Sequence, residues 1–226
     1  MTRLADISLA DKGLILFGAR PGMGLTRTVL KLANHLAESE TVLFISYQTY
    51  ERKLIKICEE LNFQKQDILF FNTRLGFYDM LSDYKTSLNV EISRTNPRTV
   101  VIDDLDGLLG ENYDLDVSLR ADLITGLQEL AVDANIRIIL NVTLSRKVEH
   151  RGGDHRPKLR DFTWCRDLVH VANEVYILYR PEYYGMRQDE HGNNLSGLME
   201  INRVKESNCN EVTYNIACDK EHIIPY

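Results

Sequence analysis

The stretch GARPGMGLT, residues 18–26, indicates which fold this chain adopts. Closely spaced glycines followed by Thr26 are typical of a phosphate-binding loop between a strand and a helix. Glycine permits backbone conformations in which successive N–H groups point inward, at the positive end of the following helix. The pattern requires a lysine at position 25, and this chain has Leu25. The stretch therefore predicts a loop that holds an anion without that lysine, or a tight strand-to-helix turn that binds nothing.

The missing lysine would carry its charge over the outer phosphates and stabilise the charge that spreads during phosphoryl transfer. Losing one charge-assisted hydrogen bond weakens ground-state binding by about 1.5–3 kcal/mol, and the loss in the transition state is usually larger. Arg27 lies on a different side of the predicted helix, and Lys12 lies at the far end of the first strand, so neither is expected to replace it. Weak binding of ATP with Mg²⁺ is therefore predicted, through Gly18, Arg20, Pro21, Gly22, Met23, Gly24, Leu25 and Thr26.

Strand and helix patterns alternate through the first 142 residues. Apolar runs predict strands at 14–17, 41–46, 68–71, 99–102 and 136–142. Helical spacing predicts helices at 25–37, 54–61, from 78 to the residue before Pro97, and 119–131. Three later strands, at 175–178, 198–201 and 212–216, follow one another without long helices, the last two as a hairpin. This order predicts an α/β fold, a mostly parallel twisted sheet with helices on both faces and an antiparallel C-terminal edge.

Composition limits the class of protein. The 226 residues are 44% hydrophobic and contain no linker-like stretch, which indicates one globular domain over 1–226. The net charge of −6 excludes a polycation that coats nucleic acid non-specifically. The four cysteines form no C-x-x-C pair, so reduced thiols are expected instead of a zinc site or a disulfide framework. A polar N-terminus and the lack of a long apolar run predict a cytoplasmic protein that does not enter the membrane.

Three further motifs follow the glycine loop in order. They are VVIDDLDGLLG at 100–110, LSRKVEHRGGDHRPKLRDF at 144–162 and VYILYRPEYY at 175–184. With these motifs the chain resembles, over nearly its whole length, the C-terminal RecA-fold motor domain of the DnaB-type replicative DNA helicases. The resemblance implies a RecA-like P-loop fold, ATP with Mg²⁺, and DNA and replication or helicase proteins as partners. The family's helical N-terminal domain has no counterpart before the glycine loop, so weak ring assembly is expected.

Carried over one at a time, the family's chemical positions are mostly changed in this chain. The phosphate-loop lysine, the acid that activates water, the sensor glutamine and the arginine finger are replaced, in that order, by Leu25, Gln48, Thr143 and Ser207. The positions expected near Mg²⁺ are kept as Thr26 and as the Walker B acid Asp103. Lys205 is also kept, where the family's residue reaches a neighbouring subunit's nucleotide. A neutral amide such as Gln48 cannot act as a general base.

Four changes that converge on one phosphate predict a non-hydrolysing domain, a binding or assembly module linked to DNA replication or mobile-element DNA metabolism. Two alternatives stay open. The chain could be an active ATP-dependent helicase in which Asp104, Asp106 or Glu51 replaces the lost base, or a sensor that binds ATP without turnover. The more ordinary interpretation of these three acids is that they are solvated charges at loop ends and in the first turn of a helix.

Segment 146–160 is locally basic on an acidic molecule. Its only acids are Glu149 and Asp154. The predicted DNA contacts are Arg146, Lys147, Arg151, Arg156, Lys158 and Arg160. Such a patch predicts weak, salt-dependent binding of single-stranded DNA. A solvated mobile loop is the alternative, and the acidic stretch 103–116 would weaken DNA binding if it lay nearby.

Overall fold

The computed structural model describes residues 2–47, 49–61, 63, 68–71, 81–104, 117–162, 166–205, 211–219 and 224–225. The strands in this part of the chain are β1 Gly13–Ala19, β2 Val42–Ser46, β3 Ile68–Phe71, β4 Thr99–Asp103, β5 Arg137–Thr143, β6 Glu174–Tyr179, β7 Leu198–Lys205, β8 Val212–Asp219 and β9 Ile224–Pro225. The α-helices are α1 Leu25–Leu36, α2 Glu51–Glu60, α3 Leu81–Thr95, α5 Val117–Asp133 and α6 Arg166–Val171. Four short 3₁₀ turns are η1 Leu4–Asp6, η2 Arg146–Val148, η3 Leu159–Asp161 and η4 Pro181–Tyr184.

Within these residues the strands form one sheet in the order β3-β2-β4-β5-β1-β6-β7-β8-β9. The six strands from β3 to β6 in this order are parallel, and β7, β8 and β9 add an antiparallel edge. The α/β fold with a mostly parallel sheet is therefore confirmed, as is the antiparallel pairing of the last two predicted strands. The helix α6 and the strand β9 were not predicted, because six and two residues are too few to show a periodicity.

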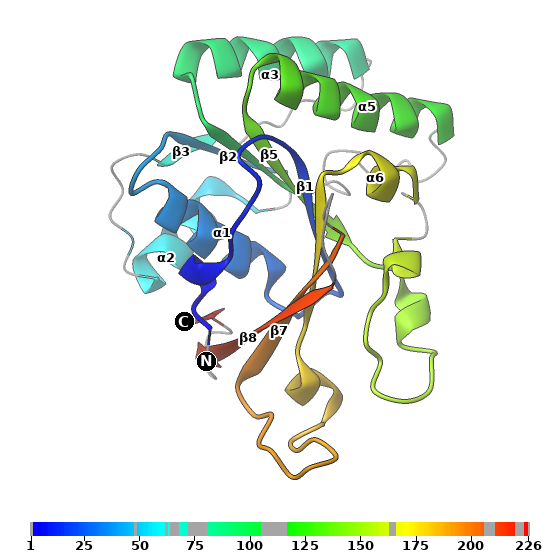
Figure 1. Cartoon of the computed structure of the whole chain (residues 1–226). Helices are drawn as coiled ribbons and strands as arrows, with labels where there is room; N and C mark the ends of the chain where they lie inside the picture. Colours follow the sequence, from blue (N-terminus) through cyan, green and yellow to red (C-terminus); the bar gives the residue numbers. More distant parts are fainter. Residues whose placement is uncertain are drawn as a thin grey trace.

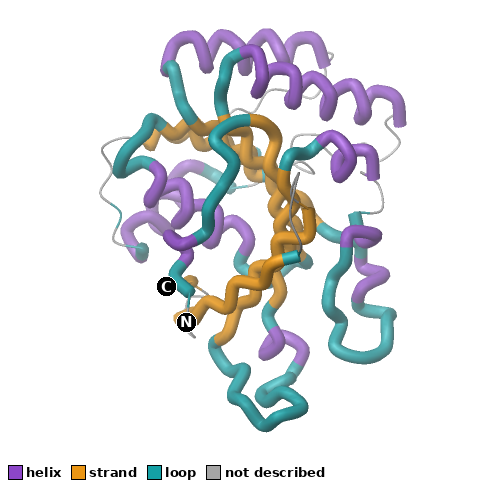
Figure 2. The backbone as a smooth tube through the Cα atoms, in the orientation of Figure 1, coloured by secondary structure: helices purple, strands orange, loops and turns teal. Residues whose placement is uncertain are grey.

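Helices cover both faces of the sheet (Figures 1 and 2), with α3 and α5 on one face and α1 and α2 on the other. The central strand β1 is buried along its whole length and contributes apolar side chains to the core on both faces of the sheet. Its Leu14 and Leu16 pack with the α3 and α5 side, while Ile15 and Phe17 pack with the α1 and α2 side. This alternation follows from the two-residue period of a strand. A strand buried on both sides must be almost entirely apolar, which explains the run at 14–17.

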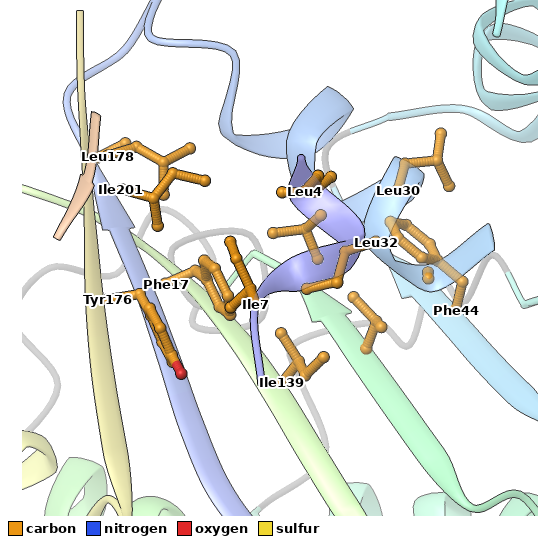
Figure 3. Packing of buried hydrophobic residues seen from close by; sticks show 14 of the residues in the cluster. Leu4, Ile7, Phe17, Leu30, Leu32, Phe44, Ile139, Tyr176, Leu178 and Ile201 are labelled. Carbon is orange, nitrogen blue, oxygen red and sulfur yellow. The ribbon is translucent and has the colours of Figure 1, made fainter. Parts of the chain in front are cut away.

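Figure 3 shows the packing on the α1 and α2 side, where the short N-terminal turn η1 adds Leu4 to the core. There Phe17 of β1 stacks on Tyr176 of β6, with ring centroids 4.8 Å apart. This contact packs β6 against β1, and the two strands pair in a parallel register that places Gly18 opposite Ile177. Since β5 flanks β1 on its other side, the carboxyl ends of β5, β1 and β6 meet at one edge of the sheet. Ligands of open α/β sheets bind at this edge.

None of the helices in the described part of the chain has the length and apolar character that crossing a membrane requires.

Candidate functional site

The glycine loop joins β1 to α1 and is built on two left-handed glycines. Gly22 has φ 84° and Gly24 has φ 86°, a region that other residues rarely adopt. Gly24 is the N-cap of α1 and brings no side chain to the first-turn N–H groups. Those N–H groups have no partner within the helix. The backbone therefore has the conformation that lets an anion bind at a helix N-terminus.

Gly18 has a different role from the one its place in the motif suggests. It lies within β1, and a Cβ on it would come within 2.4 Å of the Phe162 ring. The motif has four residues between its two outer positions, and counting back from Gly24 leads to Ala19. Ala19 therefore stands at the first position of the motif, and Gly18 is needed because Phe162 packs against the strand.

The side chain of Leu25 is half-buried and packs against the apolar cluster on the α1 and α2 side of the sheet. The next cation along α1, Arg27, pairs with Glu60 of α2 at 2.9 Å. Lys12 precedes β1, so it lies at the amino edge of the sheet, whereas the glycine loop follows the carboxyl end of β1. Leu25 therefore contributes apolar packing, and neither Arg27 nor Lys12 takes the place of the missing lysine.

Of the other three loop side chains predicted to bind the cofactor, two make structural contacts instead. Met23 is completely buried in the same apolar cluster, and Pro21 is exposed. The guanidinium of Arg20 is buried, donating to the Leu144 carbonyl at 2.5 Å and to Glu149 Oε1 at 2.9 and 2.7 Å. Arg20 therefore joins the glycine loop to segment 146–160. The prediction that Arg20, Pro21 and Met23 contact a cofactor remains a prediction, and only the backbone of Met23 is available for it.

The Walker B acid Asp103 ends β4 beside the glycine loop. Its Oδ1 accepts hydrogen bonds from Thr26 Oγ1 at 3.1 Å and from Asn141 Nδ2 at 2.7 Å, and Ser46 Oγ donates to Oδ2 at 3.4 Å. The family resemblance placed Thr26 and Asp103 near Mg²⁺, and their side chains are hydrogen-bonded to each other. A hydroxyl and a carboxylate are ligands that suit Mg²⁺ and its water shell, so these two residues fit the ion. When bound, Mg²⁺ would neutralise charge on phosphate oxygens.

Burial raises the pKa of Asp103, while the hydrogen bonds from Asn141, Thr26 and Ser46 act in the opposite direction. Because the folded chain binds this proton more tightly than the unfolded chain, the contribution of Asp103 to stability falls as the pH rises from about 3.8 through the raised value. The amide oxygen of Asn141 is also buried and has no hydrogen-bond partner in the described part of the chain. Sequence reasoning missed Asn141, although a single polar residue inside the apolar run of β5 was a signal for it.

Of the other positions at which the family carries chemical groups, the structure describes only some. Thr143 ends β5, directly beside Ala19 of β1, so it lies at the carboxyl edge of the sheet, and its place at the sensor position stays a prediction. Gln48, Ser207 and Asp106 lie outside the described residues, as do 105–116 of the acidic stretch. Asp104 follows β4 at the site and is half-buried. In the described part of the chain, no group of three or more His, Cys, Asp or Glu side chains could hold a metal ion.

Lys205 lies at the end of β7 and is held at the C-terminus of α6. Its Nζ donates to the carbonyls of Val169, His170 and Ala172 at 2.5, 2.8 and 2.7 Å. Burial lowers the pKa of this ammonium. These bonds complete the last turn of a six-residue helix, where carbonyl groups lack partners within the helix. The predicted role of Lys205 toward a neighbouring nucleotide remains untested, and that role requires these bonds to break.

The two ends of segment 146–160 lie together, since Ser145 N donates to the Asp161 carbonyl at 3.1 Å. Two of its six predicted DNA contacts pair with buried acids. Arg151 contacts Asp161 at 2.5 Å, and Arg156 makes two hydrogen bonds to Glu200 of β7. The other four predicted contacts are exposed, and no ion pair of theirs is seen among the described residues: Arg146, Lys147, Lys158 and Arg160.

Aromatic side chains attach this loop to the sheet. The guanidinium of Arg156 lies over the Tyr179 ring, 4.7 Å from its centroid. The ring of His155 packs on Tyr184 with centroids 4.8 Å apart, and Tyr179 and Tyr184 stack at 5.9 Å. Burial raises the pKa of the Tyr184 hydroxyl, for which the described residues provide no hydrogen-bond partner. These contacts bring the motif HRP at 155–157 and the motif LYRPEYY at 178–184 side by side.

Two residues at the glycine loop were not predicted. Arg180 follows β6, and Tyr183 lies in η4, one turn further along. A Cβ on Gly22 would come within 2.8 Å of the Tyr183 ring, and Arg180 Nη1 lies 3.5 Å from the Gly22 carbonyl oxygen. The available signal was topological, because residues that follow β6 lie at the same edge of the sheet as residues that follow β1.

The fold and the arrangement of its carboxyl edge define a RecA-like P-loop domain. The family model described as the DnaB-like helicase C terminal domain matches residues 91–222, more than half of the chain. The chain therefore belongs to the DnaB-like helicase C-terminal domain family, as the resemblance implied.

Curated relatives agree with this family. The chain is 28% identical over 228 residues to the probable plasmid replicative DNA helicase of Chlamydia psittaci. The alignment covers 87% of this chain and 47% of that protein. It is 26% identical over 240 residues to the replicative DNA helicase DnaB of Geobacillus stearothermophilus, covering 92% of this chain and 51% of that protein. The chain thus spans about half the length of the curated relatives it matches.

Solved structures confirm the fold. One of them, described as an ATPase domain, superposes with a TM-score of 0.76 at 21% identity, covering 96% of this chain and 85% of that one. The KaiC-like protein PH0186 from Pyrococcus horikoshii gives a TM-score of 0.67 at 14% identity, covering 97% of this chain and 91% of that one. The RecA-like architecture is therefore shared well beyond recognisable sequence similarity.

Proposed function

We propose that this chain is a DnaB-type RecA-fold domain whose nucleotide site does not hydrolyse ATP, and that it acts as a binding or assembly module in DNA replication or mobile-element DNA metabolism. The observation that carries the proposal is the packing of Leu25 against the apolar core, at the position from which a lysine would reach the outer phosphates. The nearby cations Arg20 and Arg27 are paired with Glu149 and Glu60. The lost charge is therefore not replaced by either of these two arginines.

What remains of the site supports binding more than turnover. The left-handed glycines, the N-terminus of α1 and the Thr26–Asp103 contact are the parts that hold phosphate and Mg²⁺. The parts that act in the transition state are the ones replaced by Leu25, Gln48 and Ser207. A domain that binds nucleotide without turnover therefore ranks above an active helicase with substitute residues.

The names of the relatives indicate the process and suggest partners. Two of the relatives are replicative helicases. One solved structure is described as a DnaB-like replicative helicase and its interactions with primase. It superposes with a TM-score of 0.74 at 21% identity, covering 95% of this chain and 57% of that one. A helicase or another replication protein is therefore the proposed partner class here. Self-assembly into a ring is expected to be weak, because Ser207 replaces the arginine finger and Lys205 is held at α6.

Turnover measurements test the central part of this proposal. Phosphate release from ATP with Mg²⁺ should stay at background, with and without single-stranded DNA, because the charge that stabilises the transition state is missing. The variant Asp103→Ala is the control, since it removes the carboxylate expected to order the metal. Robust release that Asp103→Ala abolishes would overturn the proposal and favour the active helicase.

The proposed DNA surface consists of the four remaining cations of segment 146–160, Arg146, Lys147, Lys158 and Arg160. They lie on or beside η2 and η3, which the Ser145–Asp161 hydrogen bond holds together. Arg151 and Arg156 are half-buried in ion pairs, so they are assigned to holding the loop in shape. Four phosphates neutralised on a single strand predict that log affinity falls with log salt at a slope of roughly −3.

A salt titration with a labelled single-stranded oligonucleotide measures this slope. Replacing all four of these cations with Ala should flatten the slope toward zero and remove most of the binding at low salt. A matched control replaces four cations elsewhere, Arg52, Lys53, Lys56 and Arg187, and should leave the slope unchanged. An unchanged slope in the first variant would exclude this surface. If the unaltered chain does not bind even at low salt, a module that binds only proteins is the better description.

A further inference from the structure

Arg180 is a buried cation at the glycine loop. It follows β6, and the residue is only 8% exposed. Its Nη1 lies 3.5 Å from the Gly22 carbonyl oxygen, and its buried Nε has no hydrogen-bond partner among the residues that the structure describes. Among the described residues, no acidic side chain forms an ion pair with it. The other buried or half-buried arginines near this edge, Arg20, Arg151 and Arg156, each pair with a carboxylate.

A buried guanidinium without an anion is energetically unfavourable, because it has lost its water and gained no opposite charge. One carbonyl at 3.5 Å, the outer limit of a hydrogen bond, compensates for little of this loss. A protein keeps such a group more readily where a ligand supplies the missing charge. The described contacts therefore leave the charge of Arg180 without an opposite charge beside it, and a bound anion would supply one.

The position of Arg180 selects the ligand. The strand β6 runs parallel to β1 and pairs with it up to Gly18 and Ile177, so the segments that follow the two strands lie side by side. The glycine loop presents N–H groups at the start of α1, which favour an anion. Tyr183, 49% exposed, rests its ring on Gly22 and so holds η4 against the same loop. Arg180 is thus fixed beside a backbone that favours phosphate.

We propose that Arg180 supplies, from the neighbouring strand, the positive charge that the glycine loop lacks at Leu25, and that the ligand is a phosphate chain such as that of a nucleoside diphosphate or triphosphate. This inference rests on the proposed function in one respect only, that the loop binds without turning over. It assigns to this residue a role in phosphate binding. It assigns no role in hydrolysis.

Equilibrium binding to the full chain tests the assignment, with a fluorescent ADP and with inorganic pyrophosphate as separate probes. Arg180→Gln keeps a polar side chain and removes the charge. It should weaken binding of both probes about tenfold or more, which corresponds to one charge-assisted hydrogen bond. Arg180→Lys should recover part of the affinity. The matched control, Arg187→Gln, removes the same charge from an exposed site on the following loop and should bind like the unaltered chain.

A structural role for Arg180 predicts a different pattern. Removing an incomplete buried charge should leave the thermal midpoint of the ligand-free chain unchanged or higher, whereas loss of a structural contact would lower it along with binding. Equal affinity of Arg180→Gln and the unaltered chain for both probes overturns the assignment, as does a lowered midpoint with no rescue by Arg180→Lys. Loss of ADP affinity alone, with pyrophosphate unaffected, would overturn the phosphate role. ATP turnover, measured separately, concerns only the proposed function.

Discussion

Replacing Leu25 with Lys and Gln48 with Glu together should tighten ATP binding by about tenfold or more while leaving turnover close to background. The lysine adds a charge-assisted hydrogen bond to the outer phosphates, worth about 1.5–3 kcal/mol. Turnover should stay low because Thr143 and Ser207 remain unsuited to the transition state, and a missing transition-state contact costs on the order of 10²–10³ in rate. Residues that act as one unit are not additive, so restoring two of four positions restores little catalysis. Equilibrium binding of a labelled nucleotide and steady-state phosphate release measure the two quantities.

The control for this experiment is Leu25→Met, which keeps an apolar side chain of similar volume at a half-buried position. It should bind ATP as the unaltered chain does, which separates the effect of charge from that of altered packing. Thermal unfolding of each variant shows whether a lysine at this position disturbs the apolar cluster that Leu25 contacts. Full turnover from the double substitution alone would contradict the prediction and show that Thr143 and Ser207 matter little.

Replacing Arg156 with Met should lower the free energy of unfolding by about 2–3 kcal/mol. Glu200 is buried and would lose both hydrogen bonds from Arg156, which leaves an uncompensated carboxylate inside the protein. Breaking a fully buried pair costs about 3–5 kcal/mol, and the cost is smaller here because the Arg156 side chain is 40% exposed and solvent screens the pair. The substitution also removes the cation–π contact with Tyr179. Urea denaturation measures the change.

The matched control is Arg160→Met, the same substitution at an exposed position of the same loop, which should change the stability by no more than about 0.5 kcal/mol. The second variant, Arg156→Met with Glu200→Gln, should recover much of the loss, because the buried charge is then removed with its partner. Equal effects of Arg156→Met and Arg160→Met would mean that the ion pair is not structural. Arg156 would then return to the set of DNA contacts.

The sequence by itself determined the class of fold and the loss of the phosphate-loop lysine. Both are local properties. The alternation of apolar strands with helical spacing predicted the parallel sheet, because the period of buried residues follows from the geometry of each element. The glycine loop was recognisable because a left-handed backbone at Gly22 and Gly24 strongly favours glycine, so the residue type records the conformation. The family resemblance placed Thr26 and Asp103 near one Mg²⁺ site, and the two residues meet because Asp103 ends β4 and Thr26 follows β1 in the same parallel sheet.

Only the tertiary structure decided which charges are free. In the sequence, the six cations of segment 146–160 look equivalent. The fold distinguishes two of them by placing Asp161 beside Arg151 and Glu200 beside Arg156. Those acids are 10 and 44 residues away in the chain. Arg180 was hidden for the same reason, because its distance from Gly22 is 158 residues along the chain and 3.5 Å in space. A sequence records which charges exist, but the free energy of each depends on its burial and on the partner that the folded chain brings to it.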